Sequence, residues 1–203
     1  MSFPVEVCDL TVRFGDTRAV DDVSFSLAGG AIVGLLGRNG AGKTTLLETL
    51  AAFRRPTSGG VLIDGEDPYE NRRLMSEMCL VREDGDLDDG VCVRDAMKIA
   101  ATLRPRWDEE TALRLVDRFE IATARKVGAL SRGQRSALAA SIGIATRAPV
   151  TMLDEPHLGG VDVWFLTDGF DRPNLALAVA AATAVVAAAV WVARRMTRDT
   201  PVR

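Results

Sequence analysis

The nine residues GRNGAGKTT, from Gly37 to Thr45, constrain the fold of this chain more than any other stretch. They match the pattern G-x-x-x-x-G-K-[ST], in which backbone N–H groups surround phosphate oxygens at the N-terminus of a helix. Such a loop needs a strand before it and a helix after it. The apolar run AIVGLLG at 31–37 predicts a strand buried on both faces, and residues 44–53 predict the helix. The motif therefore predicts a phosphate-binding loop within an α/β domain.

The side chains of this loop have separate chemical roles. Lys43 is suited to reach the β- and γ-phosphates of a nucleotide, and the Thr44 hydroxyl is suited to bind Mg²⁺. A chance glycine-rich turn is the alternative, which the strand–helix context disfavours. We predict nucleotide contacts at Gly37, Arg38, Asn39, Gly40, Ala41, Gly42, Lys43, Thr44 and Thr45.

The stretch VTMLDEP, residues 150–156, carries the second part of a site. Its apolar residues predict a buried strand that ends at Asp154, near the phosphate site of an open α/β sheet. Asp154 is predicted to hold Mg²⁺ through water, and Glu155 to orient or deprotonate an attacking water. The alternative is a strand that ends in a solvated acidic turn.

Periodicity and composition place these motifs in a domain of mixed strands and helices. Predicted strands lie at 5–13, 20–27, 61–65, 79–81 and 149–154, and predicted helices at 93–103, 108–119 and 132–146. The net charge is −3 with both signs mixed, so we expect no nucleic-acid partner. Three separated cysteines indicate free thiols in a reducing compartment. The N-terminus lacks the apolar run of a signal peptide.

The motif LSRGQ, Leu130 to Gln134, resembles the signature LSGGQ of the ATP-binding subunits of ABC transporters. The resemblance runs from about Val5 to Leu158 and is marked again in the segment 56–67. The sequence around LSRGQ is similar to a bacterial subgroup that serves small exporters. Arg132 replaces the first glycine of the signature.

The resemblance implies a P-loop NTPase fold of the ABC type, with N-terminal antiparallel strands and a helical subdomain. It implies ATP and Mg²⁺ as ligands, and a homo- or heterodimer in which each ATP lies between one subunit's phosphate loop and the other's signature. Ser131, Gly133 and Gln134 would then contact the partner's ATP. A membrane permease and a place at the cytoplasmic face of the cell membrane are also implied.

Two further positions correspond to functional residues of the resembled family, and each has an alternative role. Phe14 stands where the family stacks an aromatic ring on adenine, and the alternative is a core aromatic. Glu83 stands where the family has a glutamine that contacts Mg²⁺. A carboxylate is also a good Mg²⁺ ligand, and a solvated loop acid is an equal alternative.

Past Leu158 the chain departs from the family pattern. EPHLGGVD has one residue more than the family's motif, which displaces Asp162. The family has a histidine on the γ-phosphate some thirty to forty residues after the acidic pair, whereas this chain has one histidine, His157. We expect an incomplete ATP-binding domain at 1–158, truncated near residue 159, with impaired hydrolysis.

The remaining residues predict a junction and a hydrophobic helix. Residues 159–174 form a linker, 175–193 hold no charge, and 194–203 form a basic tail. The uncharged segment predicts a permease-like transmembrane helix, with an alanine-rich helix packed on the domain as the alternative. The arginines after it favour a cytoplasmic C-terminus. The ATPase domain must also be cytoplasmic, yet a single span would put the two on opposite sides of the membrane.

These features predict an ATP-binding subunit of an ABC exporter, for which the family resemblance implies ATP hydrolysis. Two alternatives stay open at this point. One is a hydrolysis-impaired ATP-binding remnant or heterodimer partner that lacks the phosphate-contacting histidine. The other is a remnant without function that folds poorly, because a sheet without its last strands exposes edges.

Overall fold

The computed structural model describes residues 3–82, 86–154 and 166–167. The chain divides into two compact units, Met1–Gly169 and Phe170–Arg203, and all described residues belong to the first. In chain order the elements are β1 (Val5–Phe14), β2 (Thr17–Leu27), α1 (Lys43–Leu50), β3 (Ser58–Ile63), α2 (Arg72–Glu77), β4 (Met78–Val81), α3 (Val93–Leu103), α4 (Glu109–Arg118), the 3₁₀ helix η1 (Val127–Ala129), α5 (Arg132–Ala145), β5 (Val150–Leu153) and β6 (Leu166–Thr167).

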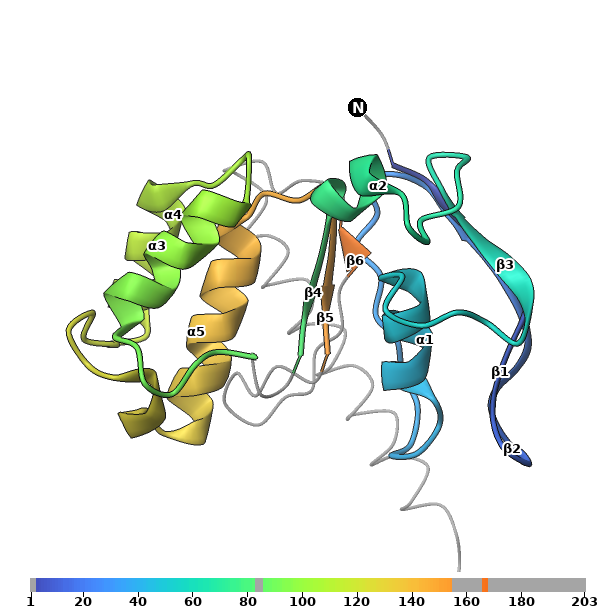
Figure 1. The fold of residues 1–203 in the computed structure, drawn as a ribbon, viewed down its shortest axis with the longest axis horizontal. Helices are drawn as coiled ribbons and strands as arrows, with labels where there is room; N and C mark the ends of the chain where they lie inside the picture. The colour runs from blue at the N-terminus through green and yellow to red at the C-terminus, as the bar shows by residue number, and fades with distance from the viewer. Residues whose placement is uncertain (1–2, 83–85, 155–165, 168–203) are drawn as a thin grey trace, which may run out of the picture. The chain divides into compact units, whose positions relative to one another are not determined.

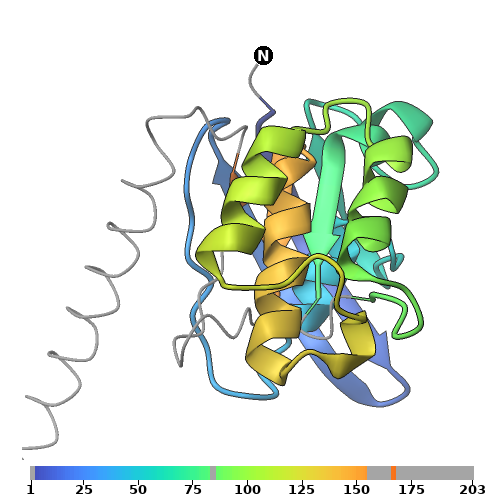
Figure 2. The same cartoon turned by 90° about the vertical axis from the view of Figure 1, so that its left-hand side faces the viewer.

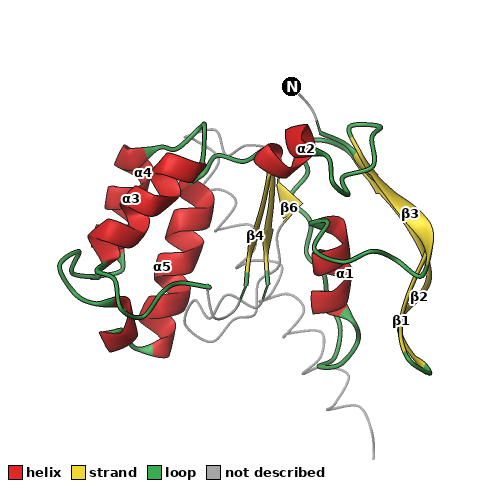
Figure 3. Cartoon of the chain, viewed as in Figure 1, coloured by secondary structure: helices red, strands yellow, loops and turns green. Residues whose placement is uncertain are grey.

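The N-terminal strands form an antiparallel sheet in the order β2-β1-β3 (Figure 3). Val5 in β1 lies opposite Leu27 in β2 and Ile63 in β3, which sets the register of both pairings. In β1 the apolar side chains alternate with exposed ones over much of its length, so one face of the sheet is buried. The predicted N-terminal antiparallel strands are therefore confirmed.

A second sheet holds the strand that leads to the predicted metal ligand. β4 and β5 run parallel, from the pair Met78–Val150 to the pair Val81–Leu153. All four residues of β5 are buried, as expected for a strand covered on both faces. Helices α3, α4 and α5 lie on one side of these strands, and α1 lies on the other (Figures 1 and 2). This arrangement confirms the predicted α/β class.

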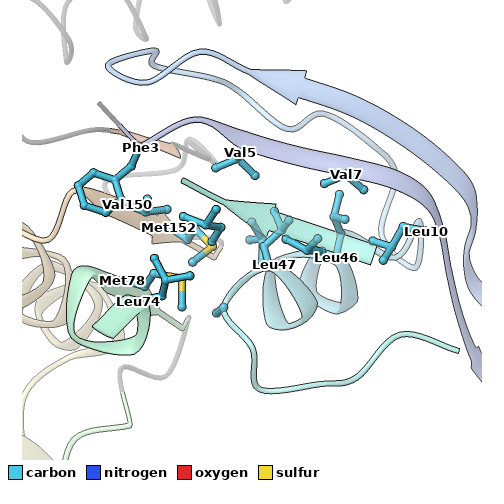
Figure 4. Close-up of a cluster of buried hydrophobic side chains, with 14 of the residues drawn as sticks. Phe3, Val5, Val7, Leu10, Leu46, Leu47, Leu74, Met78, Val150 and Met152 are labelled. Carbon is cyan, nitrogen blue, oxygen red and sulfur yellow. The ribbon is translucent and has the colours of Figure 1, made fainter. Parts of the chain in front are cut away.

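The larger hydrophobic core joins both sheets to α1. Figure 4 shows side chains of β1, α1, α2, β4 and β5 meeting in this cluster. β-Branched and leucine side chains fill it, which suits the interior of a sheet packed on a helix. Its buried members are Phe3, Val5, Val7, Leu10, Val12, Val20, Leu46, Leu47, Leu50, Ala51, Val61, Ile63, Leu74, Met78, Val150 and Met152.

Helices α3, α4 and α5 form a second cluster with shorter side chains. Its buried members are Val93, Ala96, Met97, Ala112, Val116, Ile121, Val127, Ala137, Leu138 and Ala145. A third, small cluster joins α5 to β4 and β5 and contains Cys79, Val81, Ala139, Ala148 and Leu153. The predicted helical subdomain is present, with helix bounds close to those read from the sequence.

The strand predicted at 31–37 is wrong. In the described part of the chain this run is no strand, and only Val33 makes a single-residue bridge. Its side chains alternate between half-buried and exposed, and Leu36 is 72% exposed. A strand requires ladder hydrogen bonds from a neighbour over several residues, which an apolar composition does not supply by itself.

The helix predicted at 44–53 is present but ends earlier, at Leu50. Ala52 adopts a left-handed conformation with φ of 60°. The N–H of Ala52 donates to Thr49 O at 3.1 Å, and the N–H of Phe53 donates to Glu48 O at 2.9 Å. These two bonds form a Schellman motif, which satisfies the last carbonyls and stops the helix. The sequence has no glycine here to signal this end.

The predicted junction at 159–174, the transmembrane helix at 175–193 and the basic tail at 194–203 lie outside the described residues, apart from β6. Within residues 3–82, 86–154 and 166–167, no helix is both long and apolar enough to cross a membrane.

Candidate functional site

The predicted phosphate loop turns tightly between residue 37 and the start of α1. Gly40 and Gly42 have φ angles of 81° and 85°, which glycine adopts without strain. A Cβ on Gly42 would lie inside van der Waals contact with the carbonyl oxygen of Ala19 in β2. The loop backbone therefore packs directly on β2. Gly42 is also the N-cap of α1, and no side chain of the described residues caps this helix. The N–H groups of its first turn therefore donate no hydrogen bond to a capping side chain.

Lys43 is folded back over the loop that precedes it. Its ammonium donates hydrogen bonds to the carbonyl oxygens of Gly37 at 2.9 Å and Arg38 at 3.2 Å. Its side chain is buried for a lysine, with 9% of the residue exposed. A cation held against the loop in this way sets a positive charge where phosphate oxygens are predicted to bind.

Two of the three predicted metal ligands, Thr44 and Asp154, meet although they are far apart in sequence. The Thr44 hydroxyl donates to Asp154 Oδ1 at 3.3 Å. Asp154 is 6% exposed, and its N–H donates to the carbonyl oxygen of Val81 at 2.8 Å, so β4 anchors it. The carboxyl end of β5 is thus brought against the N-terminus of α1.

A hydroxyl and a single carboxylate fit Mg²⁺ that is bound together with phosphate. Mg²⁺ in such sites takes one or two protein ligands and completes its shell with water and phosphate oxygens. No cluster of three or more His, Cys, Asp or Glu side chains capable of holding a metal occurs in the described part of the chain. Glu83 and Glu155, the other predicted acidic residues, lie outside the described residues.

Phe14 lies at the end of β1, beside the turn into β2, where it pairs with Thr17. Its ring belongs to the surface rather than to the core, because the residue is 46% exposed. The guanidinium carbon of Arg54 lies 4.6 Å from the ring centroid. Stacking of this ring on adenine stays a prediction.

The predicted signature forms the start of α5. Ser131 is the N-cap: its hydroxyl accepts from the N–H of Gln134 at 3.2 Å, and its own N–H donates to Gln134 Oε1 at 3.2 Å. This reciprocal capping box occupies the Gln134 side chain. Ser131 and Gly133 are exposed, and α5 lies across β4 and β5 from α1 (Figure 1). The chain therefore does not bring its own signature to its own phosphate loop.

The sequence analysis missed one group of charged side chains behind Phe14. Glu48 in α1 accepts from Arg54 and lies 3.4 Å from Arg82 Nη2. An acidic residue in the apolar segment LLETL could have indicated a paired carboxylate. Its partners come from a turn and from the end of β4, and no sequence spacing points to them.

Known proteins match the chain over most of its described part. A model described as ABC transporter matches residues 20–158. A cobalamin import ATP-binding protein of Halobacterium salinarum is 34% identical over 163 residues, covering 75% of this chain and 40% of the relative. A phosphonates import ATP-binding protein of Natronomonas pharaonis is 33% identical over 165 residues, covering 75% of this chain and 69% of the relative.

A solved structure confirms the predicted ABC-type fold. An ABC transporter ATP-binding protein from Pyrococcus furiosus has a TM-score of 0.67 and 21% identity, covering 87% of this chain and 82% of that chain. Export, predicted from the sequence, has no support from the two curated relatives above, because both are named for import.

Proposed function

Because the chain belongs to the ABC transporter family, we propose that it is an ATP-binding subunit that works with a membrane permease. The contact between Thr44 and Asp154 carries this proposal. It sets a hydroxyl and a carboxylate side by side at the N-terminus of α1, where the phosphates of Mg-ATP would complete the metal's ligands.

Each part of the loop has a defined task in binding. Lys43 neutralises charge on the β- and γ-phosphates after its ammonium leaves the carbonyls of Gly37 and Arg38. The N–H groups at the start of α1 bind phosphate oxygens at the positive end of the helix. Bound Mg²⁺ would supply charge stabilisation on the phosphates, and Glu155 would orient the attacking water.

The place of the signature supports head-to-tail pairing of two subunits. Ser131 and Gly133 are exposed at the N-terminus of α5, on the other side of β4 and β5 from the phosphate loop. A second subunit, identical or related, would present its own loop to these residues. A permease partner would hold the pair at the cytoplasmic face of the membrane. Binding and pairing serve transport in either direction.

Replacement of Lys43 by alanine tests nucleotide binding. The full chain should bind Mg-ATP with a dissociation constant from about micromolar to millimolar, and Lys43→Ala should remove binding. Isothermal titration and nucleotide-dependent thermal shifts provide the measurements. Lys98→Ala, at an exposed site on α3, is the charge-matched control and should bind as the wild type does. Equal binding by wild type and Lys43→Ala would rule out the proposed site.

An ATP-binding subunit with impaired hydrolysis is the second candidate. One sequence observation favours it: the single histidine, His157, follows Asp154 by three residues, where it cannot match the family's later histidine. Loss of one positioned contact costs about 10²–10³ in rate. The chain alone should therefore release phosphate at background. A family-typical rate that disappears in Glu155→Gln would contradict this candidate.

The membrane segment at 175–193 stays a prediction. If these residues insert in a bilayer, the full chain should remain with membranes after a carbonate wash. Recovery of the entire chain in the wash would remove this prediction without affecting the nucleotide site.

A further inference from the structure

A single carboxylate, that of Glu48, is held by two arginines on different segments. Arg54 donates from Nε at 3.2 Å and from Nη2 at 3.0 Å, both to Glu48 Oε2. Arg82 Nη2 lies 3.4 Å from the other oxygen, Oε1. The Glu48 side chain is 18% exposed, so these pairs are screened less by water than pairs on the open surface. The carboxylate therefore fixes the orientation of the Arg54 guanidinium.

The fixed guanidinium covers one face of the Phe14 ring. Its carbon atom lies 4.6 Å from the ring centroid, within the range of a cation–π contact. Phe14 is nevertheless 46% exposed, so much of the ring remains open to a ligand. A ring packed against a rigid cation loses little further rotamer freedom when a second flat group stacks on it.

The open ring lies within reach of a ligand whose phosphates occupy the loop. Phe14 pairs with Thr17, and Ala19, two residues further along β2, packs on Gly42 of the loop. Two strand residues span roughly 7 Å. A nucleotide can bridge a gap of this size between its phosphates and its base, whereas inorganic polyphosphate has no group to place on the ring.

We propose that Glu48 and Arg54 are positioning residues that hold the Phe14 ring for stacking on the base of a bound nucleotide. Glu48 orients Arg54, Arg54 orients Phe14, and neither contacts the phosphates. This role requires nucleotide binding at the loop as proposed above. Glu48 and Arg54 therefore affect the contribution of the base to the affinity for the nucleotide, and they leave the contribution of the phosphates unchanged.

Comparison of Mg-ATP with Mg-tripolyphosphate tests this role. Arg54→Ala should weaken Mg-ATP binding about three- to tenfold, in keeping with the loss of one aromatic contact, and should leave tripolyphosphate binding unchanged. Glu48→Gln should weaken Mg-ATP binding in the same direction and by less. Arg55→Ala is the matched control, because Arg55 stacks on Tyr69 and not on Phe14; it should change neither affinity.

Coupling to Phe14 separates positioning from general stability. Phe14→Ala with Arg54→Ala should bind Mg-ATP no more weakly than Phe14→Ala alone, since Arg54 acts through the ring. Arg54→Lys, which keeps the charge but loses the planar fork, should fall between wild type and Arg54→Ala. Equal weakening of ATP and tripolyphosphate by Arg54→Ala would show a structural role and overturn the proposal.

The outcomes also separate this proposal from the proposed function. ATP binding that depends on Lys43 but not on Arg54 overturns the positioning pair alone. Absence of any Lys43-dependent binding in the wild type overturns both the pair and the proposed function.

Discussion

The phosphate loop and the signature helix place their functional groups by different means. The loop is held by a backbone contact, since Gly42 packs on the carbonyl of Ala19, and the Lys43 ammonium adds hydrogen bonds to two loop carbonyls. The start of α5 is held by side chains, through the capping box of Ser131 and Gln134. The cores behind them also differ, because leucines and valines fill the first and four alanines contribute to the second.

The difference indicates which substitutions each region can tolerate. Backbone atoms cannot easily move away from an added Cβ. A side chain can change its rotamer, or it can be replaced by a smaller residue. Substitutions near the phosphate loop should therefore be costly and hard to compensate. Substitutions around α5 should cost less stability, and a second substitution should be able to restore part of the loss.

Gly42→Ala should have the largest effect. The new Cβ would meet the carbonyl oxygen of Ala19, and the residue's φ of 85° is strained for alanine. We expect a loss of about 3 kcal/mol or more in the free energy of unfolding, with loss of Mg-ATP binding. Urea denaturation measures the first effect and calorimetric titration the second.

Gly40→Ala is the control for backbone strain alone. Gly40 has a φ of 81°, but nothing lies within 4 Å of a Cβ there. Its cost should be about 1–2 kcal/mol, the strain of a left-handed residue. Equal losses at the two glycines would show that contact with β2 does not hold the loop.

Gly143→Ala tests the corresponding close approach between α5 and β4, beside the third cluster. A Cβ on Gly143 in α5 would overlap a methyl group of Val81 in β4, which is a side chain. Overpacking costs about 1–3 kcal/mol, partly offset by the higher helix propensity of alanine, about 1 kcal/mol. We therefore expect a net loss of up to roughly 2 kcal/mol in the free energy of unfolding.

Val81→Ala provides the compensating change for Gly143→Ala. The double variant should recover part of the stability lost in Gly143→Ala, measured by urea denaturation, because the crowded methyl is removed. Simple addition of the two single losses would contradict the expectation that a side-chain overlap between α5 and β4 is relieved by a smaller residue.

Asp108→Ala should have the smallest effect, because it removes a cap without adding a clash. Asp108 caps α4 by accepting from the N–H of Thr111 at 3.0 Å, and it pairs with Arg147 at 3.1 Å. Loss of such a cap costs about 1 kcal/mol in the free energy of unfolding at pH 7. Denaturation across a pH series measures both this loss and its pH dependence.

The pH dependence of this cap has a definite sign. The backbone hydrogen bond from Thr111, with the Thr111 hydroxyl and Arg147, lowers the pKa of Asp108 against the opposing effect of burial. A lowered pKa contributes stability above the unfolded value of about 3.9, and this contribution is lost as pH falls through the folded pKa. The difference between wild type and Asp108→Ala should therefore shrink below about pH 4. A constant difference would contradict the assignment.

Short-range patterns predicted much of the fold. The helices near 93–103, 108–119 and 132–146 follow from apolar periodicity, and all three are present. The short helix α2 was missed because its six residues carry little periodic signal. The strand at 31–37 was predicted wrongly because an apolar run does not specify a neighbour.

The predicted phosphate loop could be recognised from sequence alone, since its glycines, Lys43 and Thr44 lie within nine consecutive residues. The sequence also determined the cap of α5, because Ser131 and Gln134 are three residues apart. Only the tertiary structure decided that Thr44 meets Asp154 across 110 residues and that Arg54 covers Phe14. These contacts depend on which strands lie side by side, and strand pairing is settled by the packing of the whole core rather than by local spacing.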